Sequence, residues 1–379
     1  MAGFWAASAN AATYYVASSG NDRSTGLSPD HPWASLRRVN RADLKPGDSV
    51  LFQAGDTFFG ELVAEHSGMS GNPIVYGSYG SGKAKFIYLG SPIWFSGVHD
   101  VSFVNLDLTN HFTVAPLIAG SPGGGSSRIT IRGCYLHQSA GMAISSPNYD
   151  DSDWLIAGNT IINTGDSGLI LLGSHDVVRD NWIVNTGWNH DLGWAKHGIY
   201  AKGSGLVVAH NVIKHFSVDG ISLRSDNAYV KDNTITQGWA GVAYFDQSAH
   251  SGTTMIVGNT ISKVNNGFYF APDADSATGG HPVENFVIRR NTFQADGDDV
   301  LDFTGARYSH IAVTENTIQG SFHVAILARE PSGGGSYVEE RNVVLGNNLF
   351  GWNDTLLSFT RYRIASGRGH GDHIRTPSS

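Results

Sequence analysis

The sequence has a single cysteine, no long apolar run and few charged side chains. Among its 379 residues only Cys134 is a cysteine, so no disulfide can form within the chain. No run reaches the roughly 18 apolar residues that a transmembrane helix needs. Charged residues make up 15% of the chain and the formal net charge is −8, so the basic surface typical of nucleic-acid binding is missing. We therefore expect neither membrane insertion nor a nucleic-acid partner.

The first residues resemble the end of a secretory signal. The stretch MAGFWAASANAATYY leads from apolar residues to an Ala-x-Ala site, although the positively charged start of a signal is missing. We interpret residues 1–12 as a signal-peptide remnant or an added sequence. The expected protein is secreted, to the extracellular space or the periplasm, and monomeric.

What is abundant is a short asparagine-containing signature. From residue 154 onward, segments such as IAGNTI, VAHNVI and VKDNTI recur, and their asparagines are 22 to 32 residues apart. A minimum spacing with variable additions is typical of a solenoid in which each turn is fixed and one loop varies. Stacked asparagines at one bend can satisfy backbone groups and each other, so we assign them a structural role. The column contains Asn159, Asn181, Asn211, Asn233, Asn259, Asn291, Asn316 and Asn347.

A second strand lies between successive asparagines. It has the form Gly-apolar-x-apolar and begins at residues 168, 198, 220, 241 and 267. Strict alternation over short runs predicts strands rather than helices. We therefore predict an all-β, single-domain, right-handed parallel β-helix of about ten turns. In the turn before Asn159, which reads IRGCYL, we expect Gly133 in place of the asparagine and Cys134 as a small buried residue.

The first hundred residues differ from the repeats. Their opening, TYYVASSGNDRSTGLSPDHPWASLRRVN, resembles that of many secreted bacterial β-helix proteins, which implies an N-terminal cap. PWASLRRVNRADL is the one convincing helix candidate and would cover the open end of the stack. The expected organisation is a cap with the first turns at 13–97, the β-helix at 98–360 and a C-terminal tail at 361–379.

Two cations share one column of the predicted second strands. When Gly198 and Gly220 are aligned, Lys202 and Arg224 both fall four residues later, one turn apart and pointing outward. Strands one turn apart are about 4.8 Å from each other, so the two charges repel. A solvated surface would explain them individually, but their shared column indicates a functional site.

The residues around this pair complete a candidate active site. His197 and Asp219 precede the two glycines, and Tyr200 lies two residues before Lys202. A neighbouring cation disfavours the charged form of a lysine, and a neutral amine can act as a base. Arginine pairs with carboxylates, and a phenol can donate a proton to a leaving oxygen. These groups suit removal of the proton α to a uronate carboxylate, followed by β-elimination or by reprotonation.

The Lys202–Arg224 pattern resembles β-helix polysaccharide lyases of the chondroitinase B and alginate lyase group. The resemblance implies that Lys202 is the base and Arg224 the acid or charge partner, with a uronate polysaccharide, alginate for example, as substrate. C5-epimerases share the fold and part of the chemistry. Many members of the group have acidic calcium ligands just before the lysine, where this chain has Ala195 and His197. We therefore expect no cofactor, with calcium as the alternative.

Loops and aromatic residues near this column are expected to bind the polysaccharide. The segments 186–196 and 271–283 are the insertions next to the predicted site, and rim aromatics commonly stack on sugar faces. The expected substrate-binding residues are Trp188, Trp194, His190, Tyr269, Tyr244 and Asp246. The pairs His190/Asp191 and Asp273/Asp275 lack convincing ligand spacing, so no metal site is predicted.

Two other functions stay open at this point. A glycoside hydrolase needs two carboxylates, for which Asp219 with Asp246, or Asp298 with Asp299, are candidates. A non-catalytic polysaccharide-binding solenoid would also have aromatic rims and sparse charge, but it leaves the Lys202–Arg224 column unexplained.

Overall fold

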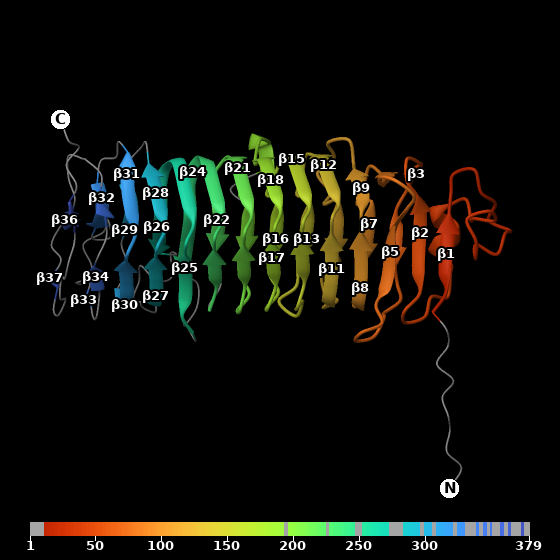
Figure 1. Cartoon of the computed structure of the whole chain (residues 1–379), viewed down its shortest axis with the longest axis horizontal. Coiled ribbons are helices and arrows are strands. Elements are labelled where there is room, and N and C mark those ends of the chain that lie inside the picture. The colour runs from red at the N-terminus through yellow and green to blue at the C-terminus, as the bar shows by residue number, and fades with distance from the viewer. Residues whose placement is uncertain are drawn as a thin grey trace, which may run out of the picture.

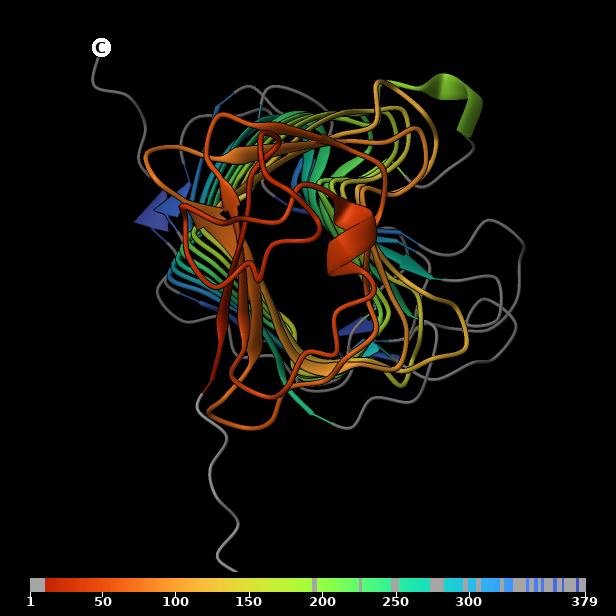
Figure 2. The ribbon, with the colours of Figure 1, turned by 90° about the vertical axis from the view of Figure 1, so that its right-hand side faces the viewer.

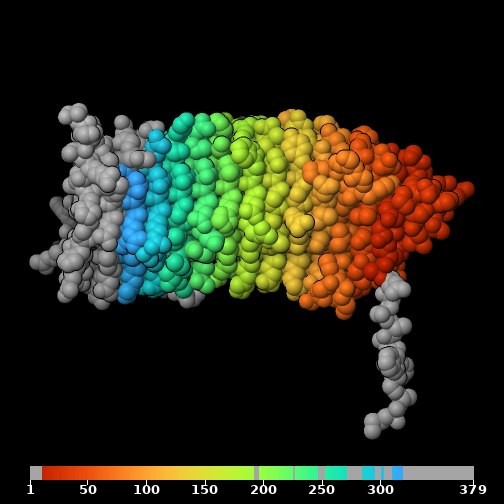
Figure 3. Space-filling model, viewed as in Figure 1, coloured from red at the N-terminus to blue at the C-terminus, as the bar shows by residue number. Residues whose placement is uncertain are grey.

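The fold is a rod of parallel strands wound into stacked coils (Figure 1). The computed structural model describes residues 11–192, 196–224, 227–246, 252–272, 283–295, 299–304 and 308–320, and the short segments 324–329, 339–340, 344–346, 349–350, 357–359, 363–364 and 373–374. The colour bands in Figure 3 show successive segments following one another along the long axis. Seen from the N-terminal end, the strands of successive coils overlay one another (Figure 2).

The first face is a thirteen-stranded parallel sheet in which each coil contributes one strand. In stacking order its strands are β1 (Thr13–Val16), β2 (Ser49–Gln53), β5 (Ile74–Tyr79), β8 (His99–Val104), β11 (Ser127–Arg132), β14 (Leu155–Ala157), β17 (Val177–Arg179), β20 (Val207–Ala209), β23 (Tyr229–Lys231), β25 (Thr254–Val257), β27 (Val283–Arg289), β30 (Tyr308–Thr314) and β34 (Val344–Gly346).

The second face includes the strands that follow the ladder asparagines and the equivalent strands of the earlier coils. They are β3 (Thr57–Phe59), β6 (Ala84–Ile87), β9 (Leu106–Thr109), β12 (Tyr135–Ser139), β15 (Thr160–Thr164), β18 (Trp182–Thr186), β21 (Val212–Phe216), β24 (Thr234–Asp246), β26 (Thr260–Pro272), β28 (Thr292–Ala295), β31 (Thr317–Gly320), β35 (Leu349–Phe350) and β38 (His373–Ile374).

The third face carries the Gly-apolar-x-apolar strands, and β24 and β26 are long enough to bend from the second face into it. Its other strands are β4 (Leu62–Ala64), β7 (Ile93–Phe95), β10 (Ile118–Gly120), β13 (Ile144–Ser146), β16 (Leu169–Leu171), β19 (Ile199–Ala201), β22 (Asp219–Leu223), β29 (Asp299–Thr304), β32 (Val324–Arg329) and β36 (Leu357–Phe359). A separate pair joins β33 (Glu339–Glu340) to β37 (Arg363–Ile364). The predicted all-β, single-domain parallel β-helix is confirmed.

The core is a continuous apolar column along the axis of the rod. Because side chains alternate along a strand, every second residue of each face points inward, and these residues are mostly Val, Ile, Leu and Phe. Ile183 from the second face and Ile199 from the third are both fully buried. Repetition of this pattern in each coil makes the stack self-consistent, because a coil buries its apolar side chains only against its neighbours.

The one α-helix among the described residues lies over the N-terminal end of the stack (Figure 2). α1 (Leu36–Val39) is shorter than the helix predicted around it, and Ser35 caps its first turn by accepting from the Arg38 amide. The chain leaves the helix because the Asn40 side chain bonds to the backbone of Glu61 and Val63 near β4. Across the described residues, no helix is long and apolar enough to cross a membrane.

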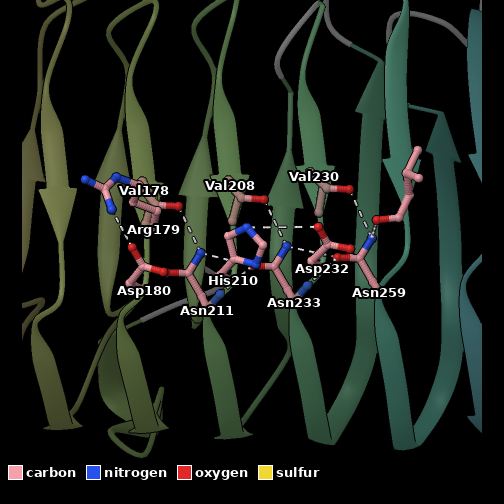
Figure 4. A network of polar contacts seen from close by, with 11 residues as sticks. Val178, Arg179, Asp180, Val208, His210, Asn211, Val230, Asp232, Asn233 and Asn259 are labelled. Carbon is pink, nitrogen blue, oxygen red and sulfur yellow. Dashed lines mark hydrogen bonds and ion pairs between the residues drawn. The ribbon is translucent and has the colours of Figure 1, made fainter.

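The predicted asparagine column is a hydrogen-bonded ladder (Figure 4). Asn211 donates from Nδ2 to Asn233 Oδ1 at 3.0 Å and to the Val178 carbonyl at 2.9 Å, and Asn233 repeats this arrangement with Asn259. The ladder runs from Asn159 to Asn316, and each of these side chains is about 1% exposed. Asn347 lies outside the described residues.

The ladder corrects the expectation that Gly133 takes the place of an asparagine. The amide of Cys134 donates to Asn159 Oδ1, as the amide of each asparagine does to the next one along. The asparagine position in this coil is therefore occupied by Cys134, and Gly133 stands where Gly158 stands one coil later. Burial raises the pKa of the Cys134 thiol to about 11, which makes it a structural residue rather than a nucleophile.

A buried carboxyl group at the entry to β17 makes the stability depend on pH. Asp176 is fully buried and accepts from the Trp154 amide, and burial together with the charges of Asp151 and Asp153 raises its pKa to about 7. Because the pKa of Asp176 is higher in the folded than in the unfolded protein, its protonated form stabilises the fold. This contribution is complete below the pKa of about 3.8 in the unfolded chain and is lost as the pH rises through 7. For this shift the loss amounts to about 4 kcal/mol.

We expect Asp176→Asn to remove this pH dependence, because the amide oxygen can still accept from Trp154 without burying a charge. Denaturant unfolding between pH 4 and pH 8 would measure the effect. Asp180→Asn is the matched control, since Asp180 is half-exposed on the same coil and pairs with Arg179. An Asp176→Asn protein with the wild-type pH slope would show that the prediction is wrong.

Candidate active site

The register of β19 and β22 places Lys202 and Arg224 in one column. Tyr200 is paired with Ser222, and Ala201 with Leu223, so the residues after Ala201 and Leu223 are also neighbours. The Lys202 amide bonds back to the Leu171 carbonyl at 2.9 Å and the Arg224 amide to Ala201 at 2.8 Å. The alignment of the two glycine motifs is therefore confirmed.

The glycines at the head of these strands are required by the close approach of successive coils. A Cβ at Gly198 would lie 2.5 Å from both the Gly220 carbonyl oxygen and Ile213 Cγ2, and one at Gly220 would lie 2.4 Å from Ile235 Cγ2. No larger side chain fits without moving the backbone or the core. The tight bend fixes the strand entry and, with it, the outward direction of the residues that follow.

Arg224 lies between two aromatic rings on the outer surface of the third face. Its guanidinium carbon is 4.8 Å from the centre of the Tyr200 ring and 4.3 Å from that of Phe245. The Lys202 amine lies 5.8 Å from the centre of the same Tyr200 ring. Both cations thus lie over one phenol ring, and among the described residues the guanidinium has cation–π contacts but no ion pair with a carboxylate.

His197 and Asp219 form a buried pair beneath this group. His197 Nδ1 lies 3.0 Å from Asp219 Oδ2, and the side chains are 6% and 0% exposed. The ring and the carboxylate are within ion-pair distance but are not aligned for a hydrogen bond, so Nδ1 and both carboxylate oxygens lack a hydrogen-bond partner. The His197 ring stacks on Tyr200 at 5.6 Å, which connects the pair to the cations above.

Buried polar atoms without a hydrogen-bond partner are concentrated around His197 and Arg224. Across the described residues, twelve buried side-chain nitrogen and oxygen atoms have no hydrogen-bond partner, and six belong to His197, Asp219, Ser222 and Arg224. In Arg224 these are the guanidinium nitrogens Nε and Nη1. Buried polar groups are normally satisfied, so a cluster of exceptions is typical of a functional site or of bound water.

Asp166 is a further carboxylate that the sequence analysis did not single out. Its Oδ1 accepts from the amide and hydroxyl of Ser167, and that hydroxyl in turn accepts from the His197 amide. Burial raises the pKa of Asp166, against the lowering effect of the Ser167 hydrogen bonds and of the charges of His197 and Lys196. A half-buried carboxyl beside a histidine is a candidate proton donor. Alignment of Gly168 with Gly198 could have indicated this contact, because it places Ser167 one coil away from His197 in the same column.

Phe245 was also missed, although the same alignment contains it. It stands four residues after Gly241, in the column of Lys202 and Arg224. Tyr269 shares the column of Tyr200, three coils further on, and it contacts Trp239 edge-to-face at 5.1 Å. The outward aromatic residues therefore extend from β19 to β26.

The expectation that Tyr244 binds substrate is wrong. Its side chain is 1% exposed and packs in the core against Phe286, with ring centres 4.6 Å apart. Tyr244 is paired with Leu223 in the adjacent coil, so alternation along β24 turns it inward. The alternation of side chains that turns Leu223 into the core therefore turns its strand partner Tyr244 into the core as well.

The remaining expected site residues have different positions. His190 is exposed in the 3-10 turn η1 (His190–Leu192), which projects from the rod at the upper right of Figure 2. Trp188 lies just before it, at a shallow depression with Phe112. Trp194, Ala195, Asp273, Asp275 and Asp298 lie outside the described residues, as do the side chains of Asp246 and Asp299.

The described residues offer no group of three or more His, Cys, Asp or Glu side chains that could hold a metal ion. The part of the site that is described consists of two cations, aromatic rings and the His197 cluster with the carboxyl groups of Asp219 and Asp166. Such a set can bind an anion through Arg224 and exchange protons through Lys202, Tyr200 and the His197 cluster.

Comparisons with known proteins agree with the fold. A family model described as right handed beta helix region matches residues 189–350. A segment of 73 residues is 41% identical to a lacto-N-biosidase from Bifidobacterium longum subsp. longum. The match covers 18% of this chain and only 5% of the length of that relative.

Three solved structures are similar over most of the chain. XylC in complex with xylose is 10% identical, with coverages of 91% of this chain and 86% of that one and a TM-score of 0.60. The A-module of a mannuronan C-5 epimerase from Azotobacter vinelandii is 12% identical, with coverages of 88% and 92% and a TM-score of 0.55. A mannuronic acid specific family 6 lyase from human gut microbiota is 15% identical, with coverages of 85% and 80% and a TM-score of 0.51. The chain has a right-handed β-helix fold that carbohydrate-active proteins share.

Proposed function

We propose that this protein is a secreted enzyme that cleaves a uronate-containing polysaccharide by β-elimination. The observation that carries the proposal is the Arg224 guanidinium, held between Tyr200 and Phe245 with Nε and Nη1 unpaired. A guanidinium is always charged and presents its donors in a planar fork that can bind the two oxygens of a carboxylate. Each uronate residue of an acidic polymer supplies such a carboxylate next to the carbon that must lose its proton.

The residues around Arg224 supply the remaining steps. With the carboxylate on Arg224, the Lys202 amine removes the C5 proton, and the charge that develops on the carboxylate is stabilised by the guanidinium. The electron pair forms the C4–C5 double bond, the C4–O bond breaks, and the Tyr200 hydroxyl donates its proton to the leaving oxygen. Solvent then returns the proton from Lys202 to Tyr200. An epimerase would share the first step and return a proton to C5 from the other face.

A panel of alginate, pectate, chondroitin sulfate and hyaluronan tests the proposal. A lyase produces an unsaturated uronate, so we expect rising ultraviolet absorbance with at least one polymer. An epimerase would change the sugar composition without chain cleavage. If no polymer gains absorbance or changes its sugar composition, the proposal is contradicted. If the protein also migrates more slowly in a gel that contains the polymer, it is a binding solenoid.

A glycoside hydrolase is the second candidate, and two observations favour it. The first is the 41% identity of one segment to a lacto-N-biosidase. The second is the half-buried carboxyl group of Asp166, because burial raises its pKa, as a general acid requires. The same panel, extended to neutral oligosaccharides such as lacto-N-tetraose, separates the two. A hydrolase forms new reducing ends without ultraviolet absorbance.

We expect the activity to survive extensive treatment with EDTA. The proposed chemistry uses Arg224 to neutralise the carboxylate, and the position where the calcium-using relatives have an acidic ligand holds His197. Activity measured before and after chelation, and after addition of calcium, tests this. A large loss that calcium restores would show that a metal takes part.

A further inference from the structure

A shallow depression lies on the corner that leads into the candidate active site. It has a volume of about 450 Å³ and is lined by Phe112, Asn163, Asn185 and Trp188. Phe112 and Trp188 meet edge-to-face with ring centres 5.7 Å apart, and Phe112 is 49% exposed. Two large aromatic side chains that face solvent together are unusual on a surface unless they bind something.

The two asparagines add directed hydrogen-bonding groups beside the rings. Asn185 donates from Nδ2 to Asn163 Oδ1 at 2.7 Å, which fixes both amides. Asn163 Nδ2 and Asn185 Oδ1 have no hydrogen bond with the described residues, so one donor and one acceptor are left for a ligand. The four lining residues carry no charge, so the depression suits a neutral ligand with hydroxyl groups and an apolar face.

The backbone at Phe112 is held in an uncommon conformation. His111 and Phe112 have φ angles of 51° and 65°, in the left-handed region that bulky residues rarely adopt. The Phe112 amide donates to the Gln138 carbonyl at 2.8 Å, which keeps the segment in place. Strain of this kind is commonly retained where it positions a functional side chain.

The loop that carries Trp188 is attached to the segment that holds Asp166 and His197. Gly187, directly before Trp188, donates to the Asp166 carbonyl at 2.9 Å, and Asn189, directly after it, donates to the Gly165 carbonyl at 2.9 Å. A Cβ at Gly187 would lie 2.6 Å from Lys196 Cβ, next to His197. Trp188 is therefore positioned by the same segment that positions the His197 cluster.

We propose that Phe112, Trp188, Asn163 and Asn185 form a subsite that binds a neutral sugar ring of the polysaccharide. The apolar C–H face of a pyranose packs on the Trp188 and Phe112 rings, and the ring hydroxyls bond to the two amides. The inference rests on carbohydrate binding as part of the proposed function, but not on the elimination chemistry. It implies a substrate that contains uncharged sugars as well as the uronate that Arg224 binds.

Affinity gel electrophoresis tests the subsite without the need for turnover. The gels contain neutral polymers (highly methyl-esterified pectin, xylan or galactan) or charged ones (pectate or alginate), and the Lys202→Ala background prevents cleavage. Trp188→Ala and Phe112→Ala should each weaken binding of a retarding neutral polymer about three- to tenfold, and Trp188→Phe should restore most of it. Arg224→Ala should weaken binding of the charged polymers and leave that of the neutral ones unchanged.

Matched surface variants control for unspecific effects. Trp182→Ala removes a tryptophan that is 44% exposed and contacts Lys214, and Phe59→Ala removes a phenylalanine that is 76% exposed. Both should bind as the parent does. The subsite is refuted if Trp188→Ala and Phe112→Ala proteins with unchanged melting temperatures bind neutral polymers normally, or if no neutral polymer retards the parent. Absence of an unsaturated product would instead contradict the lyase proposal and leave the gel result standing.

Discussion

Lys202→Ala should lower kcat by about 10²- to 10⁴-fold, the usual cost of losing a positioned general base. The amine lies over the Tyr200 ring, beside the guanidinium that would hold the carboxylate, so no other lysine of the described third face can replace it. Binding should change little, because Arg224 and the aromatic rings remain. Initial rates of unsaturated product formation, with KM measured separately, distinguish the two effects.

Lys202→Arg should not restore activity, since a guanidinium does not give up its proton near neutral pH. Lys214→Ala is the control, because this lysine contacts Trp182 on the second face and should leave turnover unchanged. If Lys202→Ala keeps more than about a tenth of the wild-type turnover, Lys202 is not the base. The base would then have to be sought at Tyr200, His197 or Asp166.

Arg224→Ala should lower kcat by about 10²- to 10³-fold and should raise KM as well. The guanidinium would contact the carboxylate in the ground state and still more strongly when negative charge develops on it in the transition state, as donors of an oxyanion hole do. Arg224→Lys should recover only part of this loss, because an ammonium group cannot present two parallel donors. The measurement is kcat and KM on the polymer that the panel identifies.

The stability of the Arg224→Ala protein is a separate readout. Nε and Nη1 have no hydrogen-bond partner, so removing these buried donors should stabilise the fold. Loss of the cation–π contacts with Tyr200 and Phe245 should destabilise it. These effects oppose each other, and we expect the unfolding free energy to change by no more than about 1 kcal/mol. Arg179→Ala, which breaks an exposed ion pair with Asp180, should affect neither turnover nor KM. Near-normal activity of Arg224→Ala would contradict carboxylate binding at this residue.

The sequence by itself determined the fold and the column of the candidate site. Alternation of apolar residues sets which side chains of a strand point inward, and this depends only on the local backbone. The recurring asparagines mark one bend per coil because each must meet the next to be satisfied. Together the two patterns are sufficient to align Lys202 with Arg224, as the register of β19 and β22 confirms.

The tertiary structure alone decided which of these groups lack partners and which are covered. Ser222 points outward by alternation, yet it is fully buried, and Asp166 joins His197 only because coils 30 residues apart are stacked. Burial and hydrogen-bond satisfaction are sums over contacts from neighbouring coils and loops, which strand periodicity does not encode. For the same reason the free donors of Arg224 and the meeting of Phe112 with Trp188 became visible only in three dimensions.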